Sequence, residues 1–414
     1  MLDQIRDHQL ARVRVGIDAL LASNRFYAKR LHPVRTWDDF ERLPFTTKRE
    51  LVADQAAEPP FGTNLTYPLE HYVRLHQTSG SSGGRPLRWL DTADSWEWWC
   101  RIWAEHVYAA AGVSASDRVF LAFSFGPFIG FWSAFEGSKR LGALTMTGGS
   151  MTTEQRLDAI LELDATVLVC TPTYALRLAD AAASAGVDLA ASAIRVTMHA
   201  GEVGASIPAT RALIESTYGA RCYDHTGMSE LGPTGFGCPD GLGVHLVENE
   251  FVFEVLPEGA DQVPGRTIPD GRGELVATNL GRWGSPVVRY RTGDVVDVTR
   301  AGCSCGSELP LARGGILGRV DDMFTVRGVN LYPAQVEEVV RRYPDVIEFQ
   351  ITHRRESHMD EVTLVLEVEP SRHAVLDVLS TELRKLLGVR VACRAVDPGT
   401  LLRPELKSRR VVRL

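Results

Sequence analysis

Residues 165–186 read ATVLVCTPTYALRLADAAASAG, which is a short apolar run, a Thr-Pro pair and then a helical pattern. The same order recurs on both sides: RVFLAFS (118–124) precedes GFWSAFEGSKRLG (130–142), and IRVTMHA (194–200) precedes IPATRALIESTYG (207–219). Repeated strand–helix units of this kind predict a parallel β-sheet with helices on both faces. Such sheets bind ligands in the loops that follow the carboxyl ends of their strands.

Other patterns flank this unit. An amphipathic helix is predicted over about Asp3–Leu31, and residues 243–299 are β-rich and punctuated by glycine, which predicts an attached antiparallel sheet or barrel. The glycine-rich junction GGILGRVDD (314–322) precedes a mixture of helix and strand patterns. We therefore predict an α/β protein with two domains. The first, residues 1–317, has a parallel sheet flanked by helices plus a β-rich subdomain, and the second, residues 318–414, is a small, mobile α+β domain.

Bulk composition excludes several classes of protein. The chain has 414 residues, 44% of them hydrophobic, and a formal net charge of −7. A folded globular protein is expected, and an acidic chain without a long basic tract is not expected to bind nucleic acid. The first residues lack the apolar core of a signal peptide and no stretch is apolar enough for a membrane span, so we expect a cytoplasmic protein without a membrane partner. Seven cysteines, an odd number in a large chain, favour reduced thiols or metal ligands over a disulfide framework.

The segment HQTSGSSGGRPLRW (76–89) interleaves hydroxyl side chains with glycines. Backbone N–H groups and hydroxyls in such a loop approach a polyphosphate closely, because glycine accepts positive φ angles. The loop is suited to the phosphates of ATP, although it lacks the Lys-Ser/Thr pair of the GxxxxGK[ST] loop. From these residues alone a flexible surface turn explains the segment equally well.

Further polar residues follow the predicted strands. AGEVG (200–204) and YDHTGMSELGP (223–233) place Gly201, Glu202, Asp224, Gly227 and Glu230 in loops that should line one crevice. Glu230 could hold Mg²⁺ against phosphates or could cap a helix.

Two more residues can be interpreted either as ligand-binding or as purely structural. RYRTGDVV (289–296) puts Asp294 at a predicted strand end, where it could accept ribose hydroxyls or simply form a turn. LLRPELKSRRVVRL (401–414) puts Lys407 in an arginine-rich tail that could equally be a solvated basic end.

The order of these motifs resembles the adenylate-forming enzyme superfamily, and specifically its phenylacetate–coenzyme A ligase branch. The resemblance extends over nearly the whole chain, because ERLPFTTKREL (41–51), TPTYALRLA (171–179) and GRVDDMFTVRGVNLYPAQVEEVV (318–340) also match segments of that branch. It implies ATP-dependent activation of a small, aromatic carboxylic acid as its acyl-adenylate, followed by transfer to coenzyme A. A homodimer is implied only because related enzymes often form one.

The resemblance also implies roles for single residues. The phosphates of ATP would be held by Ser79, Gly80, Ser81, Ser82 and Gly83. The rest of the nucleotide would be bound by Gly201, Glu202, Asp224, Thr226, Asp294 and Arg319, with the first three at the adenine and Asp294 at the ribose. Glu230 would bind Mg²⁺, Lys407 would reach the α-phosphate and the acyl carboxylate, and Asp321 would be the hinge of the small domain.

This chain departs from the branch in two respects. Its loop TSGSSGGRP is one glycine longer than the usual SSGTTGKP and has Arg85 in place of lysine. The chain is also short for the branch, so the resemblance supports adenylation more strongly than recognition of coenzyme A.

A metal site and an acyl pocket are further expectations. Cys238, His245, Cys303 and Cys305 form a Cys₃His set of the kind that holds structural Zn²⁺, and members of the resembled branch bind zinc at matching residues. The spacing is not CxxC, and four reduced side chains in loops are the alternative. For the acyl group we expect Phe123, Phe125 and Gly227 to line the pocket, although most aromatic residues of FSFGPFIGFW (123–132) would also suit the core.

Two other functions fit the same residues. An adenylating ligase could pass the acyl group to a carrier-protein thiol or to an amine. A catalytically inactive scaffold relative is the other alternative, which the presence of Glu230, Asp294 and Lys407 disfavours.

Overall fold

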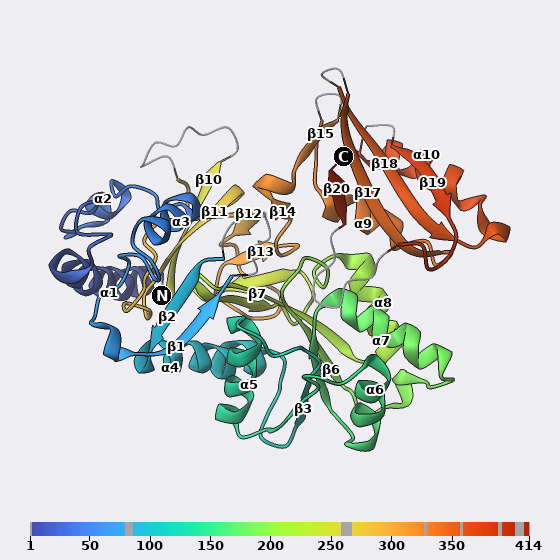
Figure 1. The fold of residues 1–414 in the computed structure, drawn as a ribbon, viewed down its shortest axis with the longest axis horizontal. Coiled ribbons are helices and arrows are strands. Elements are labelled where there is room, and N and C mark those ends of the chain that lie inside the picture. Colours follow the sequence, from blue (N-terminus) through green and yellow to red (C-terminus); the bar gives the residue numbers. More distant parts are fainter. Residues whose placement is uncertain are drawn as a thin grey trace.

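The computed structural model describes residues 2–78, 86–257, 267–326, 329–356, 359–387, 391–401 and 410–413. A large α/β part holds a 12-stranded sheet, and a smaller part at the C-terminal end holds a 4-stranded sheet with helices packed on it (Figure 1). The order of strands in the large sheet is β10-β11-β12-β13-β9-β8-β7-β6-β5-β3-β4, with β14 paired to β12. The predicted α/β class is confirmed.

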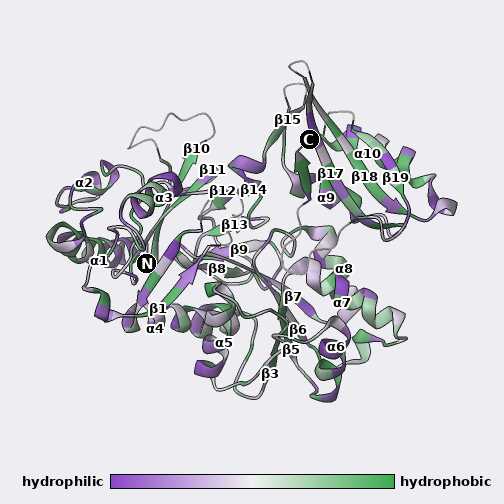
Figure 2. Cartoon of the chain, in the orientation of Figure 1, coloured by the Kyte–Doolittle hydropathy of each residue, from purple (hydrophilic) through white to green (hydrophobic). Residues whose placement is uncertain are grey.

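One half of the large sheet is parallel. Its strands are β3 (Arg118–Leu121), β4 (Leu144–Thr147), β5 (Val167–Cys170), β6 (Val196–His199) and the first part of β7 (Arg221–Met228). Helices α5 (Ile129–Leu141), α6 (Thr153–Glu162), α7 (Pro172–Ser184) and α8 (Pro208–Tyr218) connect them. Each strand is short and apolar, and Figure 2 shows β5 in hydrophobic colours along its length. This is the pattern expected of strands that are covered on both faces.

The two faces of the parallel half belong to different cores. Along β5, Val167 and Val169 join the core that also contains α4 (Ala93–Ile102), whereas Leu168 and Cys170 join the core formed with α6, α7 and α8. Because successive side chains of a strand point to opposite faces, one strand serves both cores. Helix α4, which carries most of the segment DSWEWWCRIW (94–103), is largely buried and continues into a π-helical turn (Trp103–Tyr108).

The β-rich region extends the same sheet. Strand β7 pairs with β6 in parallel as far as Asp224 and then with β8 in antiparallel from His225 onward. The remaining strands of this region are β8 (Gly232–Gly237), β9 (Gly243–Leu246), β10 (Phe251–Pro257), β11 (Gly271–Asn279), β12 (Tyr290–Thr299), β13 (Leu311–Arg313) and β14 (Gly318–Arg319). The antiparallel prediction is therefore correct, and the sheet is continuous with the parallel one.

The N-terminal residues cover one end of this sheet. Helix α1 (Leu2–Ser23) is fixed by Gln9, whose Nε2 donates to the carbonyls of Glu248 and Phe251 at 2.8 Å each. The predicted helix to Leu31 is too long, because the N–H of Phe26 donates to the carbonyl of Thr63 and breaks the helical ladder. The buried Asn24 side chain, which accepts from the N–H of Tyr27, starts a separate turn. After it come α2 (Trp37–Glu41), α3 (Lys48–Ala57) and the hairpin of β1 (Tyr72–Gln77) and β2 (Arg88–Thr92).

The C-terminal part has its own core. Its sheet has the order β19-β18-β17-β20, and a two-stranded sheet, β15 with β16, lies beside it. The elements are β15 (Phe324–Val326), β16 (Val329–Leu331), α9 (Pro333–Val340), β17 (Val346–Glu356), β18 (Met359–Val368), α10 (Val375–Leu387), β19 (Ala392–Val396) and β20 (Val411–Arg413). It touches the large part where α9 meets the start of α8, with Glu338 Oε2 accepting from the N–H of Ala209 at 2.9 Å.

No helix among the residues that the structure describes has the length and apolar character needed to cross a membrane.

Candidate active site

The carboxyl ends of three neighbouring parallel strands lie at one level. Cys170, His199 and Asp224 are register partners across β5, β6 and β7. The loop after β6 turns at Gly201, whose φ of +95° favours glycine, and Glu202 Oε1 then accepts from the N–H of Thr173 at 2.9 Å. The predicted residues Gly201, Glu202 and Asp224 are thus close to this edge, as the strand–helix pattern indicated.

Asp224 is the last residue of β7 in parallel pairing, not a loop residue as predicted, because β7 continues into the antiparallel half. Its buried carboxylate accepts from Ser206 Oγ at 2.5 Å and from the N–H of His225 at 2.9 Å. Burial raises the pKa of Asp224 to about 6 despite these hydrogen bonds. A Cβ on Gly315 would lie 2.5 Å from Ser206 Oγ, so a glycine is needed for this close approach.

Glu230 lies in the turn between β7 and β8, and its side chain is only 6% exposed. Lys48 Nζ lies 3.4 Å from Glu230 Oε1, and the hydroxyl of Tyr290 donates to the same oxygen at 3.4 Å. Sequence reasoning assigned no role to Lys48 or Tyr290. The motif ERLPFTTKREL, which contains Lys48, was the available signal.

Asp294 and Arg319 are direct partners between β12 and β14, and Arg319 Nη1 donates to Asp294 Oδ1 at 2.6 Å. The placement of Asp294 at a strand end is wrong, because β12 continues to Thr299 through a bulge in which Thr292 Oγ1 donates to the carbonyl of Leu275 at 2.7 Å.

Tyr290 connects this pair with Glu230. Burial, with the charge of Glu230 next, raises the pKa of the Tyr290 hydroxyl well above its ordinary range, and the charges of Arg319 and Asp294 also act on it. The phenol of Tyr290 is therefore neutral, hydrogen-bonded to Glu230 and near enough to Asp294 and Arg319 for their charges to act on it.

The antiparallel part of β7 carries the next three residues of the motif. Thr226 is buried, and its Oγ1 accepts from Thr234 Oγ1 at 3.1 Å. Gly227 leaves no room for a side chain, since a Cβ there would lie 2.8 Å from the carbonyl oxygen of Gly232. His225, between Asp224 and Thr226, was not selected by sequence reasoning. Its Nδ1 donates to the carbonyl of Gly235 at 2.7 Å, and burial lowers the pKa of His225 to about 4. Its imidazole is therefore neutral at physiological pH.

The two aromatic residues predicted for the acyl pocket differ in their surroundings. Phe123 is buried and stacks on Phe131 with ring centroids 3.7 Å apart. Phe125 is partly buried and makes edge contacts with Trp132 and Phe135. Phe125 is the more accessible of the two, and the assignment of both to the pocket stays a prediction.

Some predicted residues lie outside the described part of the chain. These are Lys407 and the five phosphate-loop residues Ser79, Gly80, Ser81, Ser82 and Gly83. The base of that loop is described: Thr78 N–H donates to the carbonyl of Leu87 at 2.9 Å and continues the pairing of β1 with β2. Asp321 is exposed in a 3-10 turn (Val320–Asp322) directly after β14.

A second cluster holds the predicted metal ligands. Cys238, His245, Cys303 and Cys305 bring one ligand atom each to within 4.8 Å of one another. His245 Nδ1 donates to the carbonyl of Leu309 at 3.0 Å, and its Nε2 lies 3.2 Å from Cys305 Sγ. A fixed Nδ1–H leaves Nε2 free for a metal, as is usual for ligating histidines. Three sulfurs and one imidazole nitrogen fit tetrahedral zinc.

Known proteins match this architecture over nearly its whole length. A family model described as the AMP-binding enzyme C-terminal domain matches residues 328–414. The phenylacetate-coenzyme A ligase of Pseudomonas putida is 31% identical, with 98% of this chain and 93% of that protein covered. This chain belongs to the phenylacetate–coenzyme A ligase family of adenylate-forming enzymes.

One similar ligase has been solved in two domain arrangements, and this chain can be compared with each. A 2-hydroxyisobutyryl-CoA ligase in the postadenylation state, with an acyl-AMP bound, superposes with a TM-score of 0.91 at 29% identity, covering 98% of this chain and 88% of that one. The same ligase in its thioesterification state gives a TM-score of 0.73, covering 100% and 90%. The two parts of this chain are therefore arranged as in the former.

Proposed function

We propose that the protein is an AMP-forming acid–coenzyme A ligase that activates a small carboxylic acid with ATP. The observation that carries the proposal is that buried Glu230 accepts a hydrogen bond from Tyr290, on which the charges of the Asp294–Arg319 pair also act. Asp224 lies in β7, the strand that leads into the turn with Glu230. The similarity to coenzyme A ligases supports the choice of reaction.

The chemistry requires two displacements. A carboxylate oxygen of the acid attacks the α-phosphorus of ATP, the bond to the β-phosphate breaks, and pyrophosphate leaves. The thiolate of coenzyme A then attacks the acyl carbon, and AMP leaves as the acyl–oxygen bond breaks. The protein has to align two anions and to offset the negative charge between them.

The described residues divide this work. Asp294, whose orientation is fixed by Arg319, would accept the ribose hydroxyls, and the Glu202–Asp224 edge would border the adenine. Glu230 would hold Mg²⁺, which supplies positive charge to the phosphate oxygens when bound. Lys48, whose ammonium lies 3.4 Å from Glu230, would give up this contact when Glu230 holds the cation. The phosphate loop around Ser81 and the ammonium of Lys407 complete the proposed set.

The small domain would bring Lys407 to the site. Arg410, three residues later, lies close enough to Glu202 for the charge of Glu202 to raise the pKa of Arg410, after the larger effects of burial, Glu337 and Glu348. The charge of Glu202, in the adenine-side loop, thus acts on this end of the chain, which supports a role for Lys407 in adenylation. We place the domain boundary at Gly318 and the hinge at Asp321, so that the domain can turn to admit coenzyme A.

We propose an aromatic acid as substrate, on the strength of the partly buried Phe125 and of relatives named for phenylacetate. A short branched hydroxy acid is the second candidate, because the 2-hydroxyisobutyryl-CoA ligase is similar over 98% of this chain. Cys238, His245, Cys303 and Cys305 would hold a structural Zn²⁺ that fastens β8 and β9 to the turn before β13. A carrier protein or amine as acceptor, and a homodimer, remain alternatives within the proposal.

The test is ATP–pyrophosphate exchange across aromatic and short branched acids, followed by thioester formation with coenzyme A. Lys407→Ala is the control, with exchange expected to fall by at least about 100-fold. Exchange without thioester would favour the carrier or amine acceptor. No exchange with any acid would favour the inactive scaffold and contradict the proposal.

A further inference from the structure

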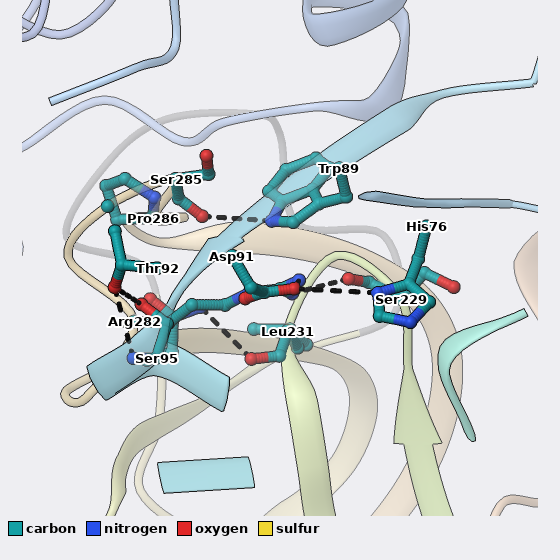
Figure 3. Close-up of polar contacts among 12 residues, drawn as sticks. His76, Trp89, Asp91, Thr92, Ser95, Ser229, Leu231, Arg282, Ser285 and Pro286 are labelled. Atoms are coloured by element: carbon teal, nitrogen blue, oxygen red, sulfur yellow. Dashed lines mark hydrogen bonds and ion pairs between the residues drawn. The ribbon is translucent and has the colours of Figure 1, made fainter. Parts of the chain in front are cut away.

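A fully buried arginine joins the two parts of the chain that would hold the phosphates and the metal. Arg282 Nε and Nη2 donate to the two carboxylate oxygens of Asp91 at 2.6 and 2.7 Å, and its Nη1 donates to the carbonyl of Ser229 at 2.5 Å (Figure 3). Both side chains of this ion pair are 0% exposed.

The two partners of the guanidinium have distinct places in the site. Asp91 lies in β2, which pairs with β1 up to Gln77 and Arg88 and forms the base of the 79–85 segment. Ser229 immediately precedes Glu230 in the turn after β7. One planar group therefore sets the distance between the base of the predicted phosphate loop and the predicted metal ligand.

The surroundings leave this group little freedom. The guanidinium carbon lies 5.3 Å from the ring centroid of Trp89 and 5.0 Å from that of Trp99. The indole N–H of Trp89 donates to the carbonyl of Ser285 at 3.0 Å, which ties β2 a second time to the segment that carries Arg282. The aromatic rings fix the plane of the guanidinium, and the hydrogen bonds at its edges prevent it from rotating within that plane.

The carboxylate is ionised. Burial alone would raise the pKa of Asp91, but the charge of Arg282 and its two hydrogen bonds outweigh burial and hold the pKa below its ordinary value. His76, in β1, has its Nδ1 3.8 Å from Asp91 Oδ2 and stacks on Trp96. Both strands at the base of the loop therefore contact the same ion pair.

A buried ion pair of this kind contributes little net stability, since an apolar pair of similar volume often replaces it without loss. What an apolar pair cannot replace is the third hydrogen bond, from Nη1 to the Ser229 carbonyl. We propose that Arg282 is a positioning residue for nucleotide activation, which through Asp91 holds the Glu230 turn in register with the β1–β2 base at Thr78 and Leu87. This inference rests on the proposed function.

The experiment separates positioning from stability with two variants of the full chain. Arg282→Lys keeps a positive charge, but a single ammonium cannot span both Asp91 oxygens and the Ser229 carbonyl. Asp91→Leu with Arg282→Met removes both charges and leaves none unpaired. We expect both variants to raise the Kd for MgATP in calorimetry and the KM for MgATP in pyrophosphate exchange by tenfold or more, with the KM for the acid changed less than twofold. The double variant should keep a wild-type Tm.

Asp117→Asn is the matched control. Asp117 is also buried and accepts two bonds from one arginine, Arg195, at 3.0 and 2.6 Å, but it lies at the amino-terminal edge of β3. Its Kd for MgATP should equal that of the wild type.

Each other outcome decides the question. Wild-type MgATP binding by the double variant would overturn the proposal, and so would loss of folding in both Arg282 variants, which would assign the pair to stability alone. Failure of the wild type to bind MgATP would overturn the proposed function itself.

Discussion

The ammonium of Lys48 lies 3.4 Å from the carboxylate of Glu230, at the residue proposed to hold a divalent cation. Lys48 is the first residue of α3 and is 46% exposed, so its side chain can leave while the buried Glu230 stays. The two cations, ammonium and Mg²⁺, would then compete for the same oxygen.

Removal of Lys48 should therefore ease metal binding. Lys48→Met is expected to lower the Mg²⁺ concentration for half-maximal pyrophosphate exchange by roughly fivefold, the factor that corresponds to a half-exposed ion pair of about 1 kcal/mol. Lys139→Met, which removes an exposed lysine paired with Glu136, is the control and should change nothing. A higher Mg²⁺ requirement for Lys48→Met would contradict the competition.

Asp224 should make stability depend on pH. Its pKa in the folded protein, about 6, is above the ordinary 3.8, so its contribution to stability is complete below pH 4 and is lost as pH rises through 6. At pH 7.5 the cost is on the order of 2–3 kcal/mol. Asp224→Asn should therefore raise Tm by roughly 2–5 °C at pH 7.5 and lose this advantage by pH 4.

Asp117 should show the opposite dependence of stability on pH, because its pKa is shifted in the opposite direction. Burial acts to raise its pKa, but hydrogen bonds from Arg195, Ser114 and Thr166 hold it below the ordinary value. Asp117→Asn should lower Tm at pH 7.5, and the difference should shrink as pH falls. If Asp224→Asn and Asp117→Asn shift Tm in the same direction at pH 7.5, the assignment for Asp224 is wrong.

The Cys₃His cluster should carry metal. Elemental analysis of the purified protein is expected to find about one zinc per chain, and Cys303→Ser should lose it together with a lowered Tm. Cys393→Ser removes a cysteine in the small domain and should keep the metal. Zinc-free protein with an unchanged Tm would show that the four side chains are ordinary reduced residues.

Glu338 should favour one arrangement of the domains. Its carboxylate accepts from the first turn of α8, where helix N-terminal N–H groups are otherwise unsatisfied. Glu338→Ala is expected to slow acyl-adenylate formation roughly fivefold, equivalent to about 1 kcal/mol, and to leave thioester formation from supplied acyl-adenylate unchanged. Glu338 also forms an ion pair with Arg342, and Glu382→Ala, which removes a second carboxylate paired with Arg342, is the control. Equal slowing of both half-reactions would contradict this.

Local patterns predicted the strand–helix units and the short separation of Gly201, Glu202 and Asp224, because parallel strand ends must meet at one edge. They did not predict Arg282, whose partners Asp91 and Ser229 are far away in the sequence, nor Ser206, which approaches Asp224 only where Gly315 allows it. Asp294 was misplaced because a bulge opposite Leu275 let β12 continue. The Cys₃His set was predicted from residue type together with the family resemblance, and its four ligand atoms meet because β8, β9 and the turn before β13 are neighbours.

Strand β7 belongs to both halves of the large sheet, and it runs from Asp224 to the turn that carries Glu230. The span between Asp224, proposed to border the base, and the turn of Glu230, proposed to hold the metal, is consequently mostly a fixed length of strand. Deletion of a single residue within β7 would turn every later side chain of the strand to the opposite face.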